Sequence, residues 1–148
     1  MRLYFAAPLF SEAELEFNRS VVARIEDAGH EVFLPQRDGP EADSTAHTDG
    51  TDHLHEIFNA DRRAILDADL VVAVLDGSTV DDGVAVEIGI AYENDIPIIG
   101  LKTDDRTFSE HEHVNSMVYS PLSDLYRDST ELVNHLRGLS RTQLDSRQ

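Results

Sequence analysis

Hydrophobic residues follow two alternating patterns along this chain. Short runs that are apolar at most positions predict strands, and they lie at residues 2–6, 31–35, 70–76 and 96–101. Elsewhere apolar residues recur at intervals of three and four positions, which predicts helices over residues 12–29, 53–68, 83–94 and 128–138. The start of the first helix is also marked by Ser11 and Glu14, which have the spacing of a capping box.

Strands that alternate with helices predict an α/β fold. The runs 70–76 and 96–101 are almost continuously apolar, which is typical of parallel strands buried on both faces. We therefore expect a single-domain, doubly wound parallel sheet of about five strands, flavodoxin-like or Rossmann-like, over residues 1–148. Ligands of such sheets bind beyond the carboxyl ends of the strands, so a site is expected at the strand-to-helix junctions. The polar stretch 36–52 is expected to be a long loop, with a function or mobility of its own.

Composition narrows the classes of partner and chemistry. The formal charge of −17 argues against nucleic acid or an anionic membrane as partner, because like charges repel. The chain has no cysteine, which excludes disulfides, thiolate metal sites and a thiol nucleophile. No apolar run is long enough to span a bilayer and no signal peptide is apparent, so we expect a cytoplasmic protein. An acidic surface with Lys102 as the only lysine suggests adaptation to high salt.

The junction after the first strand argues against several ligands of α/β folds. Residues 7–14 read APLFSEAE, which lacks the glycine pattern of a dinucleotide fold, the P-loop pattern and the hydroxyl-rich turn of a flavodoxin. Phosphate-containing cofactors are therefore disfavoured, and no cofactor is expected. A receiver domain is an alternative with this topology, but it needs acidic residues where Ala6, Ala7 and Pro8 stand.

A carboxylate without a polar neighbour on its own helix face lies in the segment GVAVEIGIAY, residues 83–92. The positions three and four residues from Glu87 are all glycine or apolar residues, namely Gly83, Val84, Ile90 and Ala91. One interpretation is an ionised carboxylate that points into a pocket; the other is a side chain that reaches back to an amide at the helix start. A buried unpaired carboxylate costs several kcal/mol, which favours a functional role.

A second carboxylate interrupts an apolar helical stripe. Asp61 occupies the position that completes the pattern formed by Leu54, Ile57, Phe58 and Ile65, so it is expected to face inward. The alternative is a charge at the edge of the stripe that pairs with Arg62 or Arg63. Two inward carboxylates in a cysteine-free α/β chain suggest chemistry on a sugar, where an oxocarbenium-like transition state is stabilised by a carboxylate near the anomeric carbon.

Four motifs in order resemble the nucleoside 2-deoxyribosyltransferase family, from the first strand to about residue 118. They are LYFAAPLF at 3–10, FNAD at 58–61, DGVAVEIGIAY at 82–92 and NSM at 115–117. The resemblance implies that Glu87 is the nucleophile, Asp61 lies at the nucleobase and Tyr4 supports Glu87. It further implies that Asp81 contacts the 5′-hydroxyl, that Gln36 faces the base, and that a neighbouring subunit lends Asn115 and Met117.

The resemblance also implies a reaction and an assembly. A 2-deoxyribosyl group would pass between nucleobases of 2′-deoxynucleosides through a covalent glutamyl intermediate, with retention and without a metal. The partners would be small deoxynucleosides and free bases, and the protein a homo-oligomer, dimer or hexamer, with shared active sites. Pro8 and Leu9 stand where the best-known members have glycine and tryptophan, so the preference for purine or pyrimidine stays open.

Three alternatives remain at this point. A related deoxynucleoside 5′-monophosphate N-hydrolase has a serine where this chain has Asp81, and a carboxylate there repels phosphate, although Ser78 and Thr79 lie nearby. A catalytically silent nucleotide-sensing domain is the second. Metal binding by the histidine pairs is the third, but no matching third ligand accompanies either pair, which favours solvated loop histidines; the pairs are His53 with His55 and His111 with His113.

Overall fold

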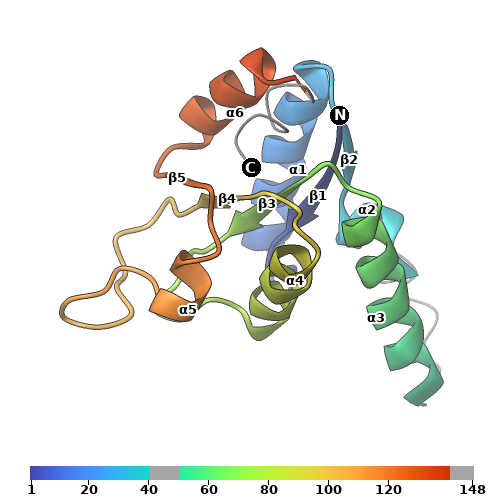
Figure 1. Cartoon of the computed structure of the whole chain (residues 1–148), viewed down its shortest axis with the longest axis horizontal. Helices are drawn as coiled ribbons and strands as arrows, with labels where there is room; N and C mark the ends of the chain where they lie inside the picture. Colours follow the sequence, from blue (N-terminus) through green and yellow to red (C-terminus); the bar gives the residue numbers. More distant parts are fainter. Residues whose placement is uncertain (41–50, 141–148) are drawn as a thin grey trace.

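The protein forms one parallel five-stranded sheet in the order β2-β1-β3-β4-β5 (Figure 1). The computed structural model describes residues 1–40 and 51–140. The strands are β1 (Arg2–Ala6), β2 (Glu31–Phe33), β3 (Leu70–Val74), β4 (Ile98–Leu101) and β5 (Asp124–Tyr126). All four strand pairs are parallel, so the expected α/β fold with about five strands is confirmed.

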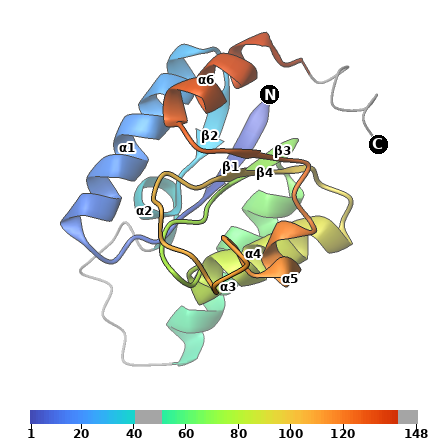
Figure 2. The same ribbon diagram turned by 90° about the vertical axis from the view of Figure 1, so that its left-hand side faces the viewer.

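Helices cover both faces of the sheet. They are α1 (Glu12–Asp27), α2 (Pro35–Asp38), α3 (Thr51–Leu66), α4 (Asp82–Glu93), α5 (Ser116–Tyr119) and α6 (Ser129–Gly138). Helices α1 and α6 lie on one side of the sheet, while α3 and α4 lie on the other (Figure 2). The predicted capping box is present, because Ser11 accepts from the Glu14 amide and Glu14 accepts from the Ser11 amide. No helix in the described ranges is long and apolar enough to cross a membrane.

The pleat of β1 divides its side chains between the two cores. Leu3 and Phe5 pack in the core beneath α1 and α6, whereas Tyr4 and Ala6 belong to the core beneath α3 and α4. This division follows from the two-residue period of a strand. It directs the fully buried Tyr4 side chain toward the helix that carries Glu87.

Three local features differ from the sequence prediction. The predicted strand 31–35 ends at Phe33, and α2 follows, because Pro35 at the first helical position has the φ value of a helix. Helix α2 also occupies the start of the predicted loop 36–52, while residues 41–50 of that loop lie outside the described ranges. Strand β5 and helix α5 are short and partly polar, so no apolar run or helical period indicated them.

The apolar stripe of α3 is buried only near its C-terminal end. Ile65 is fully buried and Ile57 is half-buried, but Leu54 is 66% exposed and Phe58 is 48% exposed. In Figure 1 the N-terminal half of α3 extends away from the sheet, which explains why these side chains find no core. The expectation of a continuous inward stripe was therefore wrong for this half of the helix.

Candidate active site

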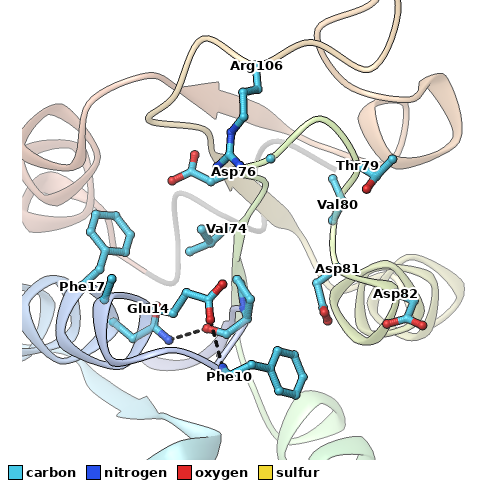
Figure 3. Close-up of a pocket in the computed structure, with 14 residues that line it drawn as sticks. Phe10, Glu14, Phe17, Val74, Asp76, Thr79, Val80, Asp81, Asp82 and Arg106 are labelled. Atoms are coloured by element: carbon cyan, nitrogen blue, oxygen red, sulfur yellow. Dashed lines mark hydrogen bonds between the residues drawn. The ribbon is translucent and has the colours of Figure 1, made fainter.

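The larger of two neighbouring cavities lies beyond the carboxyl ends of β1 and β3, as expected for this fold. It has a volume of about 710 Å³ (Figure 3). Its walls come from the loop after β1, from the first turns of α1, and from the segment that joins β3 to α4. The residues include Pro8, Phe10, Glu14, Asn18, Val74, Asp76, Thr79, Asp81, Asp82 and Arg106.

Negative charge predominates in this cavity. The carboxylates of Glu14, Asp76, Asp81 and Asp82 line it, against the single guanidinium of Arg106 among the lining residues that the structure describes. Burial acts to raise the pKa of Glu14, but hydrogen bonds from Ser11 and from the Phe10 amide outweigh it, and the pKa of this carboxyl lies below its usual value. Glu14 is therefore ionised near neutral pH.

The second cavity joins the two carboxylates that interrupt the apolar helix faces. It has a volume of about 420 Å³, and Asp61 and Glu87 both line it. The rest of its wall is mostly apolar, from Ile57, Phe58, Ile65, Val86 and Ile90, with Arg62 at the side. Asp82 lines both cavities, so the two lie next to each other at the start of α4.

Glu87 is held from the strand beneath it. The hydroxyl of Tyr4 donates a hydrogen bond to Glu87 Oε1 with an O–O distance of 2.5 Å. The prediction of a buried, unpaired carboxylate was wrong, since Glu87 is half-buried and has this donor. No sequence period could reveal the pair, because 83 positions separate the two residues. A hydroxyl that donates to a carboxylate stabilises its ionised form and fixes its direction.

Tyr4 is itself fixed in position. Its side chain has no exposed surface, and its ring stacks on Phe33 of β2 with centroids 5.7 Å apart and an angle of 11° between the planes. A buried ring with one polar end aims that end at a defined point. The strand register thus sets where the Glu87 carboxylate lies.

Asp81 caps the helix that carries Glu87. Its Oδ2 accepts a hydrogen bond from the amide of Val84 at 3.2 Å, and the residue also lines the larger cavity. Asp81 is therefore the N-terminal cap of α4. It uses one carboxylate oxygen, and contact with a 5′-hydroxyl stays a prediction.

Gln36 is tied to the wall behind the larger cavity. Its Oε1 accepts from Asn18 Nδ2 and its Nε2 donates to the Leu15 carbonyl, both at 2.9 Å. Asn18 is almost completely buried, lines the cavity, and also donates to the Pro8 carbonyl at 2.9 Å. These contacts give Gln36 a place in the support of the β1–α1 loop, and its contact with a base stays a prediction.

The NSM segment lies elsewhere on this chain. Asn115 caps α5 by accepting from the Met117 amide at 2.9 Å, and the Met117 side chain is 80% exposed. Neither residue belongs to the described lining of the two cavities.

Sequence reasoning missed the contacts of Lys102. It is fully buried directly after β4, and its ammonium donates to Asp104 and to two backbone carbonyls of the segment after β3. Burial acts to raise the pKa of Asp104, but the hydrogen bonds from Lys102, the Gly77 amide and Arg106 lower it to about 2. The available signal was a single lysine placed immediately after a buried strand.

A buried tyrosine that orients a carboxylate beside a second carboxylate, at the carboxyl edge of a parallel sheet, defines an α/β site suited to glycosyl chemistry. The family model for nucleoside 2-deoxyribosyltransferase matches residues 3–138. The chain therefore belongs to the nucleoside 2-deoxyribosyltransferase family, whose enzymes are of the glycosyltransferase and N-glycosidase type.

Solved structures of similar proteins cover nearly the whole chain. A conserved protein from Enterococcus faecalis is 30% identical over 93% of this chain and 97% of its own, with a TM-score of 0.77. A 2-deoxyribosyltransferase from Bacillus psychrosaccharolyticus is 22% identical over 97% and 96%, with a TM-score of 0.77. A CMP N-glycosidase from Clostridium botulinum is 20% identical over 92% and 98%, with a TM-score of 0.57. No curated protein matches the sequence significantly.

Proposed function

We propose that this protein transfers the 2-deoxyribosyl group between nucleobases, with Glu87 as the nucleophile. The observation that carries the proposal is the hydrogen bond from Tyr4 to Glu87, which orients the carboxylate at a cavity that Asp61 also lines. A carboxylate so held has the direction and the charge that attack on an anomeric carbon requires.

The reaction has two displacement steps. Glu87 attacks C1′ of the nucleoside, the bond from C1′ to the base nitrogen breaks, and the electron pair leaves with the base. Asp61, or a water beside it, supplies the proton that the departing base takes up. A second base then attacks C1′ of the glutamyl ester, loses a proton and releases the Glu87 carboxylate, so that two inversions give retention.

The 2′-deoxy sugar suits this route. The transition state carries positive charge on C1′ and the ring oxygen, and a 2′-hydroxyl would withdraw electron density from it. Its absence lowers the barrier, while the negative charge of Glu87 stabilises the cation at short range.

The larger cavity suits a neutral 5′ end. Among the described residues, four carboxylates and one guanidinium line it, and that guanidinium already contacts Asp104. Asp81 can accept a hydrogen bond from a 5′-hydroxyl, whereas a 5′-phosphate would bring about two negative charges against it. The charge balance supports nucleosides as substrates ahead of their monophosphates.

A 5′-monophosphate N-hydrolase is the second candidate. Arg106 and Thr79 line the same cavity and together offer a cation and a hydroxyl to a phosphate. In this reaction water would attack the glutamyl ester in place of a second base.

Shared sites between subunits complete the proposal. The exposed Met117 and the exposed apolar residues Leu54, Phe58 and Val86 are surface that a second copy of the chain can cover. Asn115 and Met117 would then contribute to the pocket of a neighbouring subunit in a homo-oligomer.

One incubation tests the proposed reaction. The protein is mixed with deoxyadenosine or deoxyinosine and a different free base, and the products are separated by chromatography. A new deoxynucleoside is the expected result. Free base without exchange would replace the transferase by a hydrolase, and unchanged substrates in both low and high salt would contradict either enzyme and leave the silent nucleotide-sensing domain.

The 5′ preference has its own test in Asp81→Ser. Repulsion of a few kcal/mol between Asp81 and a phosphate predicts that deoxyadenosine exceeds its monophosphate in kcat/KM by about a hundredfold in the wild type. The substitution removes the repelling charge but keeps an oxygen that can cap α4, so the ratio should fall or invert. Equal ratios in both proteins would show that Asp81 does not recognise the 5′ position, and would favour the hydrolase.

A further inference from the structure

Lys102 connects the end of β4 to the turn that follows β3. Its ammonium donates to the Leu75 carbonyl at 3.2 Å, to the Gly77 carbonyl at 2.9 Å and to Asp104 Oδ1 at 2.6 Å. An ammonium has three N–H donors, so these contacts engage all of them. The side chain has no exposed surface, and the cost of burying the charge is offset by the contact with Asp104 and the two carbonyl dipoles.

Further hydrogen bonds join the turn after β3 to the same segment, and one of them has the turn as its donor. The carboxylate of Asp76 accepts from the Thr103 amide at 2.5 Å and from the Thr103 hydroxyl at 2.6 Å. The Gly77 amide donates to Asp104 Oδ2 at 2.9 Å. We call these contacts, made by Asp76 and Gly77 with residues 102–104, the Lys102 latch.

The latched turn contains a glycine that has no side chain to pack. Gly77 has a φ of +113°, and a Cβ atom there would come within 2.8 Å of the Thr79 carbonyl oxygen. A glycine in this conformation has no side chain to anchor it and loses much conformational entropy on folding. The buried ammonium supplies directional contacts at this point, which an apolar side chain of similar size could not.

The latched turn forms a wall of the larger cavity. Asp76, Thr79 and Asp81 line it (Figure 3). Gly77 lines it as well, and Asp81 caps the helix that carries Glu87. Only three residues lie between Gly77 and Asp81 in the sequence. Displacement of the turn would therefore move the Asp81 carboxylate relative to a bound sugar.

We propose that Lys102 is a positioning residue, which acts through the turn at Asp76 and Gly77 to hold Asp81 against the 5′ end of the bound nucleoside. Lys102 is not among the residues that line the cavity in the described part of the chain. The inference rests on the proposed function, since it concerns the 5′ contact of that same site. It assigns recognition of the 5′ end in part to a residue on a different strand.

The test compares two substrates in Lys102→Met, which keeps the length of the side chain and removes its charge. Deoxyadenosine has a 5′-hydroxyl and 2′,5′-dideoxyadenosine has none. Misplacement of Asp81 should lower kcat/KM for deoxyadenosine by about tenfold or more, while the value for the dideoxy substrate changes by less than about twofold. A loss that is equal for both substrates would indicate a merely structural role and overturn the proposal.

The matched control is Asp105→Asn in the same segment. Asp105 forms an exposed ion pair with Arg127 and has no part in the latch. The ratio of the kcat/KM values for the two substrates should therefore not change in this variant. Thr103→Val is a milder second variant, which removes one hydroxyl contact with Asp76 and leaves the buried charge paired. It should lower the ratio of kcat/KM for deoxyadenosine to kcat/KM for 2′,5′-dideoxyadenosine by a few fold. An unchanged ratio would count against the latch.

Restoration of the ammonium provides a rescue. Because the chain has no cysteine, Lys102→Cys contains a single thiol, which can be aminoethylated in the unfolded protein to give a side chain of nearly lysine length. After refolding, the substrate ratio should return toward that of wild-type protein taken through the same treatment. A refolded, aminoethylated protein that keeps the ratio of Lys102→Met would contradict the role of the charge.

Amide hydrogen exchange separates the latch from the proposed function. In Lys102→Met the amides from Gly77 to Val84 should exchange faster than in the wild type, while those of β1 stay protected. A wild-type protein that converts no nucleoside would overturn the proposed function. The difference in amide exchange between the wild type and Lys102→Met would still show whether Lys102 holds the turn. Unchanged exchange at these amides in the folded variant would overturn the latch itself.

Discussion

At the scale of single residues, the direction of the Glu87 carboxylate depends on a tyrosine from β1, an interior strand of the sheet. Tyr4 is buried, stacked on Phe33 and hydrogen-bonded to Glu87, so the two side chains are placed as a unit. Glu87→Gln and Glu87→Ala should therefore differ in their effect on stability, because only glutamine keeps an acceptor for the tyrosine hydroxyl.

Glu87→Gln should remove catalysis without loss of stability. The amide oxygen can still accept from Tyr4, so the free energy of unfolding should stay within about 0.5 kcal/mol of the wild type. Glu87→Ala takes this acceptor away from a buried hydroxyl and should cost about 1–3 kcal/mol. Both variants should lose at least about a thousandfold in kcat/KM, since neither has a nucleophile. Urea melts and initial rates measure the two effects; a glutamine variant with more than about a tenth of wild-type activity would contradict the assignment.

At the scale of elements, the sequence predicted the strands and helices best where a buried element has a long run or a regular period of apolar residues. The runs that became β1, β3 and β4 and the helical periods of α1, α4 and α6 all lie in the described fold close to their predicted bounds. Strand β5 has only three residues, and its first residue, Asp124, is exposed, so no apolar run predicts this strand. It forms because it pairs with β4 at the edge of the sheet. The same limit applies to the site. Glu87 stood out because no polar residue shares its helix face, but Tyr4 was named only through the resemblance. The latch arises from contacts between loops far apart in sequence, which no local pattern indicates.

The loop contacts of Asp104 should appear in the pH dependence of stability. Its pKa is about 2 in the folded protein, below the ordinary value of 3.8, so its ionised form stabilises the fold. The contribution of about 2 kcal/mol is complete above the unfolded pKa and is lost as pH falls from about 4 toward 2. Asp104→Asn should be less stable than the wild type at pH 6, and the difference should shrink toward pH 2. A difference that does not depend on pH in urea melts would contradict this origin.

At the scale of the whole molecule, charge should make stability depend on salt. A formal charge of −17 on 148 residues repels itself in the folded state, and salt screens that repulsion. The urea midpoint should therefore rise by a measurable amount from dilute buffer to molar KCl. Equal midpoints across the salt series would contradict adaptation to high salt.

Shared active sites between subunits would be visible as complementation. Glu87→Ala and Asn115→Ala subunits should each be inactive alone, since each lacks one part of the pocket. After mixing and subunit exchange, part of the activity should return, because some pockets combine two intact contributions. A protein that is monomeric and fully active at the assay concentration would contradict the shared site.

Identification of the covalent intermediate tests the central claim most directly. Fluorine in place of a 2′-hydrogen of the nucleoside destabilises the cationic transition state and should slow both steps. If the nucleoside carries a base that leaves readily, the first step stays faster than the second and the glutamyl ester accumulates. Digestion of the quenched protein and mass spectrometry of the peptides should find the fluorinated sugar on Glu87, and no such label should form in Glu87→Gln. Release of the base with no labelled peptide, or with the label on another residue, would contradict nucleophilic attack by Glu87.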